Sequence, residues 1–464
     1  MTAAAIRSAG DRPEASDPSS FVHSCAAIAP ISTEPSVLEE HSRDASRAEP
    51  SGLPVLIAFP RSAAEVSALL RTANEFGIPV VTRGAGTGLS GGAIAAAGCL
   101  VISTRNLTEL EVDPVARTAS VGAGVITAEL DRAAATHGLM YAPDPVSSET
   151  STIGGNIATN AGGPRCLSYG VTADAVRELE VVLADGRIIR TGSQTIKNST
   201  GYDLTRLFIG SEGTLGVVTR AVVRLREAIP AERTAFAISH PDLETIGRLI
   251  QRITGLATNP VSLELMDANT LDVVAEHFPD IMLPQGSAML AGEYAGDAIP
   301  QRIDELRALC DELDAEISVG DRAEEILLTR MRVNPALNRS GLVASCDVVL
   351  PLPRLTDMLA EIPTIAVRHG MRVNTFAHAG DGNLHPAVVA DPDDPASLET
   401  AERVLDDITA RAIELGGMIS GEHGIGSLKT HHLTEQFSPD MLGLMHQIKQ
   451  ALDPRGILNP GRAI

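Results

Sequence analysis

The sequence predicts an α+β fold with at least two domains, on three observations. The chain has 464 residues, more than one hydrophobic core ordinarily supports. Short apolar runs typical of strands alternate with segments of helical periodicity. A section rich in glycine and short strands, residues 83–218, precedes a half in which amphipathic helices alternate with strands. This change in pattern predicts one domain on each side of a boundary near residues 226–233.

Composition limits the classes of partner and compartment. Asp and Glu number 59 against 37 Lys and Arg, and the net charge of −22 opposes binding to nucleic acids and anionic membranes. No apolar run approaches the ~20 residues of a transmembrane helix, and the longest, 342–350, contains Asp347. The five cysteines form no CxxC pair, which favours a reducing cytoplasm over a disulfide framework. Residues 1–22 lack a signal-peptide pattern and are expected to form a disordered tail.

The first predicted unit is a strand, a helix and a second strand. Residues 54–59 form an apolar run, and Ser62 with Glu65 makes a capping box that begins a helix. Gly77 ends that helix, and residues 78–82 are expected to form the next strand.

Later segments predict a hairpin and a sheet covered by helices. Residues 176–189 contain an Asp-Gly turn between two strand-like runs, as in a hairpin. Beyond the boundary, the order strand–helix–strand occurs twice, which predicts an antiparallel sheet with helices on one face. Residues 301–313 have an apolar helical face, and residues 400–464 are expected to be mostly helical.

A glycine-rich loop at residues 83–93 has the glycine spacing of a dinucleotide-binding fingerprint. Its glycines satisfy the spacing GxGxxG after an apolar strand. A Rossmann loop must open a helix that crosses back to a parallel strand. Only residues 92–98 separate these glycines from the strand expected at 100–103, which leaves no room for that helix. The Rossmann interpretation is therefore rejected.

Two interpretations of this loop remain. Consecutive backbone N–H groups can curl around a pyrophosphate, with Arg83 and Ser90 adding contacts. The alternative is a flexible surface loop. The further segments 143–145, 152–163 and 210–218 have the same turn-rich character, and together they favour one large ligand laid across many backbone turns.

Two turns in the second half carry candidate metal ligands. The segment His-Ala-Gly-Asp-Gly-Asn-Leu-His, residues 378–385, places two histidines around a tight turn that can bring both imidazoles to one point. The segment Ser-Gly-Glu-His-Gly, residues 420–424, offers a carboxylate at Glu422 and a base at His423. Two histidines and one carboxylate suit Zn²⁺, Mn²⁺ or Fe²⁺. Spacing alone leaves open the alternative of two capped turns with incidental histidines.

Three of these segments carry a family resemblance. Residues 83–93, 152–163 and 197–218 resemble the vanillyl-alcohol oxidase / para-cresol methylhydroxylase (PCMH) superfamily of flavoproteins. They are more closely similar to its branch of D-lactate dehydrogenases, FAD-binding subunits of glycolate oxidase and D-2-hydroxyglutarate dehydrogenases. The resemblance covers about residues 50–464.

The resemblance implies a fold and a domain order. It implies a PCMH-type FAD-binding domain of two subdomains, followed by a ferredoxin-like α+β substrate or cap domain with an antiparallel sheet. A C-terminal helical segment then returns to the FAD domain and completes the active site. The expected domains are a tail at 1–22, the FAD domain at 23–228, the cap domain with the metal site at 229–415, and the C-terminal segment at 416–464.

The resemblance also implies the residues around FAD. Some superfamily members attach FAD covalently through a histidine in the glycine loop, but Thr87 occupies that place here, so FAD is expected to bind without a covalent bond. The residues assigned to FAD are Arg83, Gly84, Ala85, Gly86, Thr87, Gly88, Leu89, Ser90, Pro143, Asp144, Thr150, Gly154, Gly155, Asn156, Thr159, Asn160, Gly162, Gly163, Glu212, Gly213, Gly216, Val218 and Asn459.

Carried over residue by residue, the resemblance assigns the catalytic roles. His378, His385 and Glu422 become ligands of a divalent metal, Zn, Mn or Fe, and His423 becomes the general base. Arg330 matches the arginine that grips the substrate carboxylate with paired hydrogen bonds. The alternatives for that position are a solvated helix arginine, or the neighbouring Arg332 in the same role.

The implied activity is oxidation of a small D-2-hydroxy acid to a 2-oxo acid, with hydride passing to flavin N5 and electrons to a quinone, a cytochrome or an electron-transfer flavoprotein. Leu327 stands where the family commonly has Trp, and Ser345 and Ala387 depart from the hydroxyglutarate branch, which favours D-lactate, glycolate or a medium apolar acid. Alternatives are carbohydrate or ether-lipid chemistry on the same fold, and a non-catalytic FAD subunit of a glycolate oxidase-like complex. The expected protein is cytoplasmic or peripheral to the membrane through its electron acceptor, and a homodimer or complex subunit.

Overall fold

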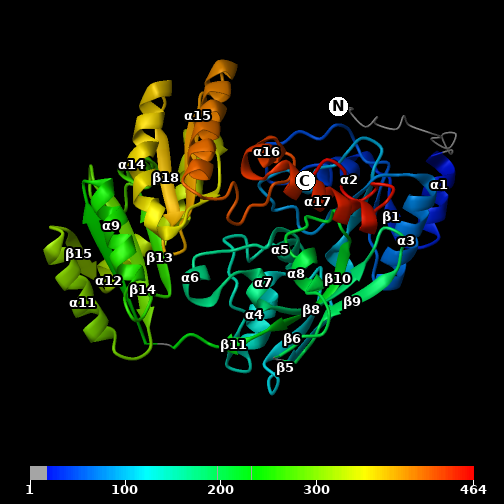
Figure 1. Cartoon of the computed structure of the whole chain (residues 1–464), viewed down its shortest axis with the longest axis horizontal. Coiled ribbons are helices and arrows are strands. Elements are labelled where there is room, and N and C mark those ends of the chain that lie inside the picture. The colour runs from blue at the N-terminus through cyan, green and yellow to red at the C-terminus, as the bar shows by residue number, and fades with distance from the viewer. Residues whose placement is uncertain (1–17, 196, 231) are drawn as a thin grey trace.

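The computed structural model describes residues 18–195, 197–230 and 232–464 and consists of two parts side by side (Figure 1). Residues 1–17 of the predicted tail lie outside the described residues. Residues 18–22, also assigned to that tail, instead begin helix α1 (Pro18–Ala26). Phe21 is buried in a core with Phe76 at a ring-centroid distance of 5.4 Å, so apolar packing orders this stretch.

The first sheet contains the predicted strand–helix–strand unit. Its strands are β1 (Ile31–Ser32), β2 (Leu56–Ala58), β4 (Leu100–Ser103) and β3 (Val80–Arg83), in that spatial order. Helix α3 (Ala63–Phe76) joins β2 to β3. Ser62 caps α3 by accepting a hydrogen bond from the Glu65 N–H, but the Glu65 carboxylate accepts from Arg61 N–H, one residue earlier than a capping box requires. Gly77 ends the helix in the left-handed conformation.

The glycine loop contains no helix, as the short gap predicted. Strands β3 and β4 nevertheless pair in parallel, with Val81 opposite Val101. Residues 84–99 make the whole connection as turns and irregular backbone. Without a helix, the backbone N–H groups of this loop are not used in intrahelical hydrogen bonds, although those from Ala93 onward include several that bond within the protein.

The second sheet is antiparallel and includes the predicted hairpin. Its spatial order is β5-β6-β10-β8-β9, and Gly186 adopts φ +83° in the turn between β8 and β9. The strands are β5 (Leu110–Asp113), β6 (Thr118–Gly122), β8 (Val176–Val182), β9 (Ile188–Gly192) and β10 (Val217–Arg224), and β7 (Leu139–Met140) pairs separately with β11 (Arg226–Glu227). The helices of this part are α2 (Pro35–Glu40), η1 (Thr104–Asn106), α4 (Thr127–Ala135), α5 (Ile153–Thr159), α6 (Cys166–Tyr169), α7 (Thr172–Ala175) and α8 (Leu204–Phe208).

The second part is built on one large antiparallel sheet, as predicted, in the order β15-β12-β14-β13-β18-β19-β16, with β17 also paired to β19. The strands are β12 (Arg233–His240), β13 (Ser262–Met266), β14 (Ala288–Ala295), β15 (Glu316–Val319), β16 (Leu342–Ser345), β17 (Val348–Val349), β18 (Val373–His378) and β19 (Asn383–Ala390). The helices are α9 (Leu243–Thr254), α10 (Ala268–His277), α11 (Ile299–Glu312), α12 (Asp321–Thr329), η2 (Arg330–Arg332), α13 (Val333–Ser340), α14 (Leu352–His369) and α15 (Pro395–Glu414).

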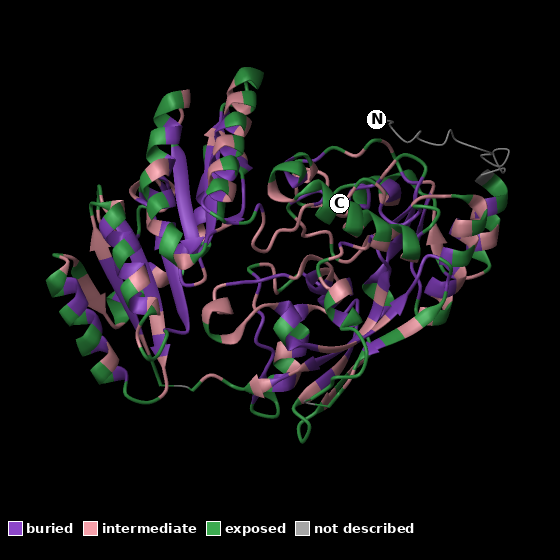
Figure 2. Cartoon of the chain, in the orientation of Figure 1, coloured by how far each residue is buried: buried purple, intermediate pink, exposed green. Residues whose placement is uncertain are grey.

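Helices cover both faces of this sheet, so the prediction of one covered face was wrong. Side chains from α9, α11, α14 and α15 form one core with Phe236 and Ile238 of β12. Side chains from α10, α12 and α13 form another core with Ala235 and Ala237 of the same strand. The apolar residues of β12 therefore point alternately into two cores, and the central strands are buried (Figure 2).

The C-terminal segment returns to the first part, as expected, and joins its parallel sheet. It contains η3 (Thr430–His432), α16 (Leu433–Gln436) and α17 (Pro439–Leu452). Leu458 forms a parallel bridge to Val80, and Ile457 and Leu458 are buried in the core of the first sheet. The Asn459 side chain donates hydrogen bonds to the carbonyls of Gly92 and Glu212. The last residues of the chain thus complete the domain that its first residues begin.

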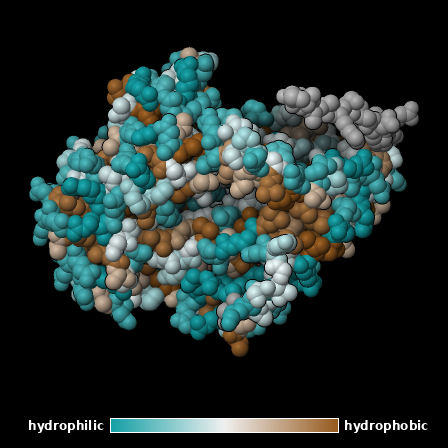
Figure 3. Space-filling model, viewed as in Figure 1, coloured by the Kyte–Doolittle hydropathy of each residue, from teal (hydrophilic) through white to brown (hydrophobic). Residues whose placement is uncertain are grey.

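The surface carries an apolar area beside the C-terminal helices. Hydrophobic residues gather near the C-terminal helices on the face in Figure 3, and Met441 and Leu444 of α17 are exposed. Among the described ranges, no helix combines the length and apolar character needed to cross a membrane.

Candidate active site

The β18–β19 hairpin brings the two predicted metal-binding histidines together. Phe376 lies opposite His385 in the register, and His378 lies opposite Asn383. Opposite residues in an antiparallel pair project to the same face, so both imidazoles leave the sheet on one side. Their ring centroids are 5.1 Å apart with planes at 85°. The tight turn therefore brings the two imidazoles close together, as its sequence predicted.

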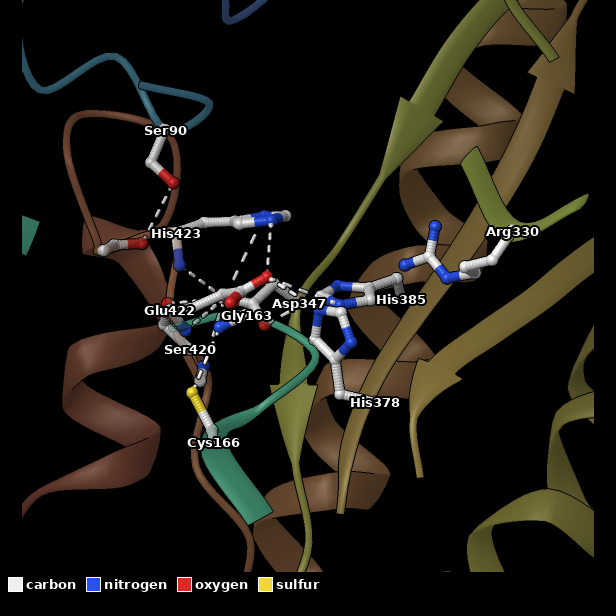
Figure 4. Close-up of polar contacts among 12 residues, drawn as sticks. Ser90, Gly163, Cys166, Arg330, Asp347, His378, His385, Ser420, Glu422 and His423 are labelled. Atoms are coloured by element: carbon white, nitrogen blue, oxygen red, sulfur yellow. Dashed lines mark hydrogen bonds and ion pairs between the residues drawn. The ribbon is translucent and has the colours of Figure 1, made fainter. Parts of the chain in front are cut away.

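Asp347, between β16 and β17, holds the segment that carries the other candidates. Its Oδ2 accepts hydrogen bonds from the Ser420 hydroxyl at 2.8 Å and from the N–H groups of Gly421, Glu422 and His423 at 3.0, 3.0 and 2.8 Å (Figure 4). Successive N–H groups around one oxygen form an anion-binding nest whose anion is a side chain of the protein. This interaction fixes residues 420–423 against the sheet.

The three predicted ligands converge. Glu422 Oε1 lies 3.5 Å from His378 Nε2 and 3.5 Å from His385 Nε2 (Figure 4). Ligands 2.0–2.1 Å from a tetrahedral Zn²⁺ lie about 3.4 Å apart, so these separations suit one shared cation. His378 Nε2 is buried without a hydrogen-bond partner in the described part of the chain. An orphaned nitrogen of this kind fits a metal ligand.

Glu264 orients His378 from behind. It lies opposite His378 in the β13–β18 register, and its carboxylate lies 2.8 Å from His378 Nδ1. A metal-binding histidine commonly donates its other N–H to a carboxylate in this manner. Burial lowers the pKa of His378, but Glu264 and then Glu422 raise it well above its ordinary value. Burial, with neighbouring His378, lowers the pKa of His385 well below its ordinary value, which keeps that ligand neutral.

His423 lies at the edge of the same cluster. Its ring stacks on His385 with centroids 5.2 Å apart and planes at 17°. Its Nε2 lies 3.7 Å from Glu422 Oε1, and its Nδ1 lies 3.9 Å from Asp347 Oδ2. The His423 side chain is 20% exposed, whereas those of His378 and His385 are almost fully buried. His423 is thus the imidazole of the three that is most open to a bound molecule.

The two arginines considered for the carboxylate-binding role lie in different surroundings. Arg330 is buried, lines the cavity beside the histidines and donates from Nε to Glu264 at 3.0 Å. Its guanidinium lies 4.5 Å from the centre of the Phe376 ring. Arg332 instead pairs with Asp280 at 2.9 Å on the exposed side of η2. Arg330 is the arginine that faces the cluster.

A cavity of about 390 Å³ runs from the glycine loop to the histidine cluster. Most residues predicted to surround FAD line it, and these are Gly84, Ala85, Gly86, Thr87, Gly88, Leu89, Ser90, Gly154, Gly155, Asn156, Thr159, Gly162, Glu212, Gly213, Gly216 and Val218. His378, His385, Glu422, His423 and Arg330 line its other end. One continuous cavity therefore joins the two sets of predicted residues.

The other residues predicted to contact FAD are outside the lining of this cavity: Arg83, Pro143, Asp144, Thr150, Asn160, Gly163 and Asn459. Arg83 donates to the Arg43 carbonyl, and Asp144 pairs with Arg165 at 2.9 Å. Asn160 caps α5 in the left-handed conformation. These contacts brace the loops from outside.

Several important residues were not predicted. Glu264 and Asp347 are the main ones, followed by the cavity residues Thr82, Gly92, Thr104, Thr152, Ser211, Asn334, Leu337, Val343 and Phe376. The sequence does contain a pattern that could have identified these two acids. Glu264 is the one carboxylate in the apolar run Ser262–Met266, and Asp347 is the one carboxylate in the apolar run 342–350. A buried charge needs partners, and at such positions it indicates a functional network.

Comparisons with known proteins identify both halves of the chain. Residues 54–192 match the model of an FAD binding domain, and residues 229–463 match the C-terminal domain of FAD linked oxidases. The chain is 39% identical over 419 residues to "Glycolate oxidase subunit GlcD" of Bacillus subtilis, covering 88% of this chain and 89% of that protein. It is 38% identical over 412 residues to "D-lactate dehydrogenase" of Archaeoglobus fulgidus, covering 88% and 91%.

The solved structures support the fold. Substrate-bound p-cresol methylhydroxylase superposes with a TM-score of 0.78 at 18% identity, covering 96% of each chain. This likeness confirms the predicted PCMH-type architecture of an FAD domain and an α+β second domain.

We expect Asp347→Ala to release the segment that carries Glu422. The substitution removes the acceptor of four hydrogen bonds, and losing one partner of a buried charged network costs roughly 3–5 kcal/mol of unfolding free energy. Amide hydrogen exchange at residues 421–423 should become faster. Asp185→Ala is the matched control, because Asp185 accepts from the Arg187 N–H in an exposed turn. Unchanged exchange at 421–423 would contradict the role given to Asp347.

Proposed function

The chain belongs to the FAD-linked oxidase family, and from that premise we propose that it oxidises a small D-2-hydroxy acid to the 2-oxo acid with non-covalent FAD and a divalent metal ion. The observation that carries the proposal is the convergence of His378, His385 and Glu422, whose ligand atoms all lie within 4.8 Å of one another, at one end of the cavity. Relatives named as a glycolate oxidase subunit and a D-lactate dehydrogenase support this substrate class.

The residues present suit both groups. FAD, when bound, supplies a hydride acceptor at flavin N5. The loop at 84–90 would hold it through backbone N–H groups, with the glycines of helix α5 (Ile153–Thr159) lining the same cavity, and Thr87 offers no imidazole for a covalent bond. A divalent metal held by the two histidines and Glu422 supplies a Lewis acid that lowers the pKa of the substrate hydroxyl. The buried orphan nitrogen of His378 supports that assignment.

Separate residues of the chain bind the substrate and accept its proton. Arg330 binds the substrate carboxylate through its guanidinium and is held in place by Glu264. His423 accepts the hydroxyl proton at Nε2, the nitrogen nearer to Glu422. The cavity between the glycine turns and the large sheet excludes bulk water and keeps Cα near the hydride acceptor.

The cavity wall favours a monocarboxylic acid. Among the described residues that line it, Arg330 is the one Lys or Arg side chain. Leu337, Val343 and Phe376 line the same region and provide an apolar surface for a short side chain. A second carboxylate would have no cation there, which disfavours hydroxyglutarate relative to D-lactate or glycolate.

The electrons are then passed to a quinone, a cytochrome or an electron-transfer flavoprotein. The relative named as a subunit of glycolate oxidase supports work within a complex. Neither the choice of acceptor nor the choice among Zn²⁺, Mn²⁺ and Fe²⁺ changes the roles given to the residues above.

The direct test is anaerobic flavin reduction. The FAD-loaded protein is stripped of metal, refilled with Zn²⁺, Mn²⁺ or Fe²⁺, and mixed in a stopped-flow instrument with D- and L-lactate, glycolate and D-2-hydroxyglutarate. We expect bleaching by D-lactate or glycolate that depends on metal. Bleaching without metal would favour carbohydrate or ether-lipid chemistry, and no bleaching by any hydroxy acid would favour a non-catalytic subunit.

We expect His423→Ala to bind substrate but to reduce flavin at least ~10²-fold more slowly, the usual loss for a general base. Single-turnover flavin absorbance measures the rate, and its dependence on substrate concentration gives the Kd. His446→Ala, in the exposed helix α17, is the control. An unchanged reduction rate in His423→Ala would remove this residue from proton transfer.

We expect Arg330→Lys to weaken substrate binding by about tenfold or more, because an ammonium cannot make the paired grip of a guanidinium. Arg332→Lys is the matched control, since Arg332 pairs with Asp280 outside the cavity. The same titrations give both dissociation constants. Equal affinity in Arg330→Lys and the unaltered protein would exclude Arg330 as the carboxylate-binding residue.

A further inference from the structure

A second cluster of possible ligands lies outside the active site, where the C-terminal segment meets α15. It consists of Asp406 of α15 with His431 and His432 of η3, and these ligand atoms all lie within 4.8 Å of one another. We propose that Asp406, His431 and His432 bind a second divalent metal ion, Zn²⁺. This ion would connect the C-terminal segment to α15, in the part of the chain built on the large antiparallel sheet.

The distances match a metal site. Asp406 Oδ1 lies 3.2 Å from His432 Nε2 and 3.5 Å from His431 Nε2. Two ligands of a tetrahedral Zn²⁺ are about 3.4 Å apart, since each lies 2.0–2.1 Å from the metal. The side chains of Asp406 and His431 are 54% and 58% exposed, so water can complete the coordination. Two imidazoles, one carboxylate and water form a common ligand set for Zn²⁺.

His432 has the supporting contact expected of a metal ligand. Its ring is buried, and its Nδ1 lies 2.9 Å from Glu435 Oε2 while Nε2 faces Asp406. The Glu435 contact favours a proton on Nδ1, so that the lone pair of Nε2 points toward Asp406, where the cation would lie. It repeats at the surface the relation of Glu264 to His378 in the cavity.

A simple ion pair explains less of the geometry. A protonated His432 between Asp406 and Glu435 would account for its own two contacts. That pair alone does not require His431, which brings a second imidazole nitrogen to 3.5 Å from the same Asp406 oxygen, with its ring centroid 3.9 Å from that of His432. Two imidazolium ions at that spacing would repel each other, whereas one shared cation holds both rings neutral.

The position of this site gives it a structural role. Helix α15 ends at Glu414, and the chain then passes through Glu422 and His423 before it returns to α15 at His432. A metal on Asp406 would therefore close a loop that contains both residues. The binding itself is independent of the proposed function, and only its benefit to catalysis depends on that function.

The test counts metal ions in the full-length protein. After chelation, each variant is dialysed against buffered Zn²⁺ at about 10 µM, a range in which specific protein sites fill, and bound Zn²⁺ is measured by mass spectrometry. We expect about two Zn²⁺ per chain in the unaltered protein and in the His446→Ala control. We expect about one in His431→Ala and about one in His378→Ala. His431 is exposed, so its replacement should leave the fold intact.

The experiment distinguishes failure of this inference from failure of the active-site proposal. Equal Zn²⁺ content in His431→Ala and the unaltered protein would overturn this inference and leave the active-site proposal standing. One Zn²⁺ in the unaltered protein, kept in His378→Ala but lost in His431→Ala, would support this inference and exclude Zn²⁺ as the active-site metal. As a second readout, Zn²⁺ should slow amide exchange across residues 415–432 in His378→Ala. The His378→Ala/His431→Ala double variant should show no slowing, and equal slowing in both would also overturn the inference.

Discussion

The geometry of the site depends on Asp347, a buried carboxylate that accepts hydrogen bonds from successive N–H groups of one backbone turn. Asp347 has no measurable exposure, and an isolated charge there would lose its hydration without replacement. Burial raises its pKa, but His423 and Lys429, together with the N–H donors of the turn, bring the pKa well below its ordinary value. The charge is thus kept, with its hydrogen bonds gathered on Oδ2, and this interaction positions Glu422 beside the two histidines of the β18–β19 hairpin. Glu212 does the same from the other domain, accepting from the N–H groups of Ile425 and Gly426 at 2.7 Å.

A second shared carboxylate links the two functions of the site. Glu264 contacts Nε of Arg330 and Nδ1 of His378, so one buried acid orients both the guanidinium and a ligand imidazole. Burial raises the pKa of Glu264, but His378 and Arg330 lower it below its ordinary value. Because these groups share one charge, the proposed function implies that substrate and metal affinities are coupled through Glu264.

The sequence predicted what local patterns and the resemblance determine. The α3 unit, the β8–β9 hairpin and the meeting of His378 with His385 each depend on residues close in the chain. Glu264 and Asp347 were missed because their partners lie far away: Glu264 is 114 residues from His378, and Asp347 is 76 residues from His423. Pairing over such distances follows from sheet order, which periodicity does not reveal. The second covered face was missed for a related reason, since a fully apolar strand does not show how many layers surround it.

The return of the chain to its starting sheet has a consequence for synthesis. Leu458 bridges Val80, and Asn459 and Arg462 hold the carbonyls of Gly92 and Gly91 in the glycine loop. Residues up to Arg462 must therefore leave the ribosome before the loop can take its final form, although the loop itself is made early. The intervening domain can mature on its own hydrophobic cores during that interval. We therefore expect the first domain to finish folding after the second, and a chain truncated before Leu458 to carry a finished second domain and an unfinished first one.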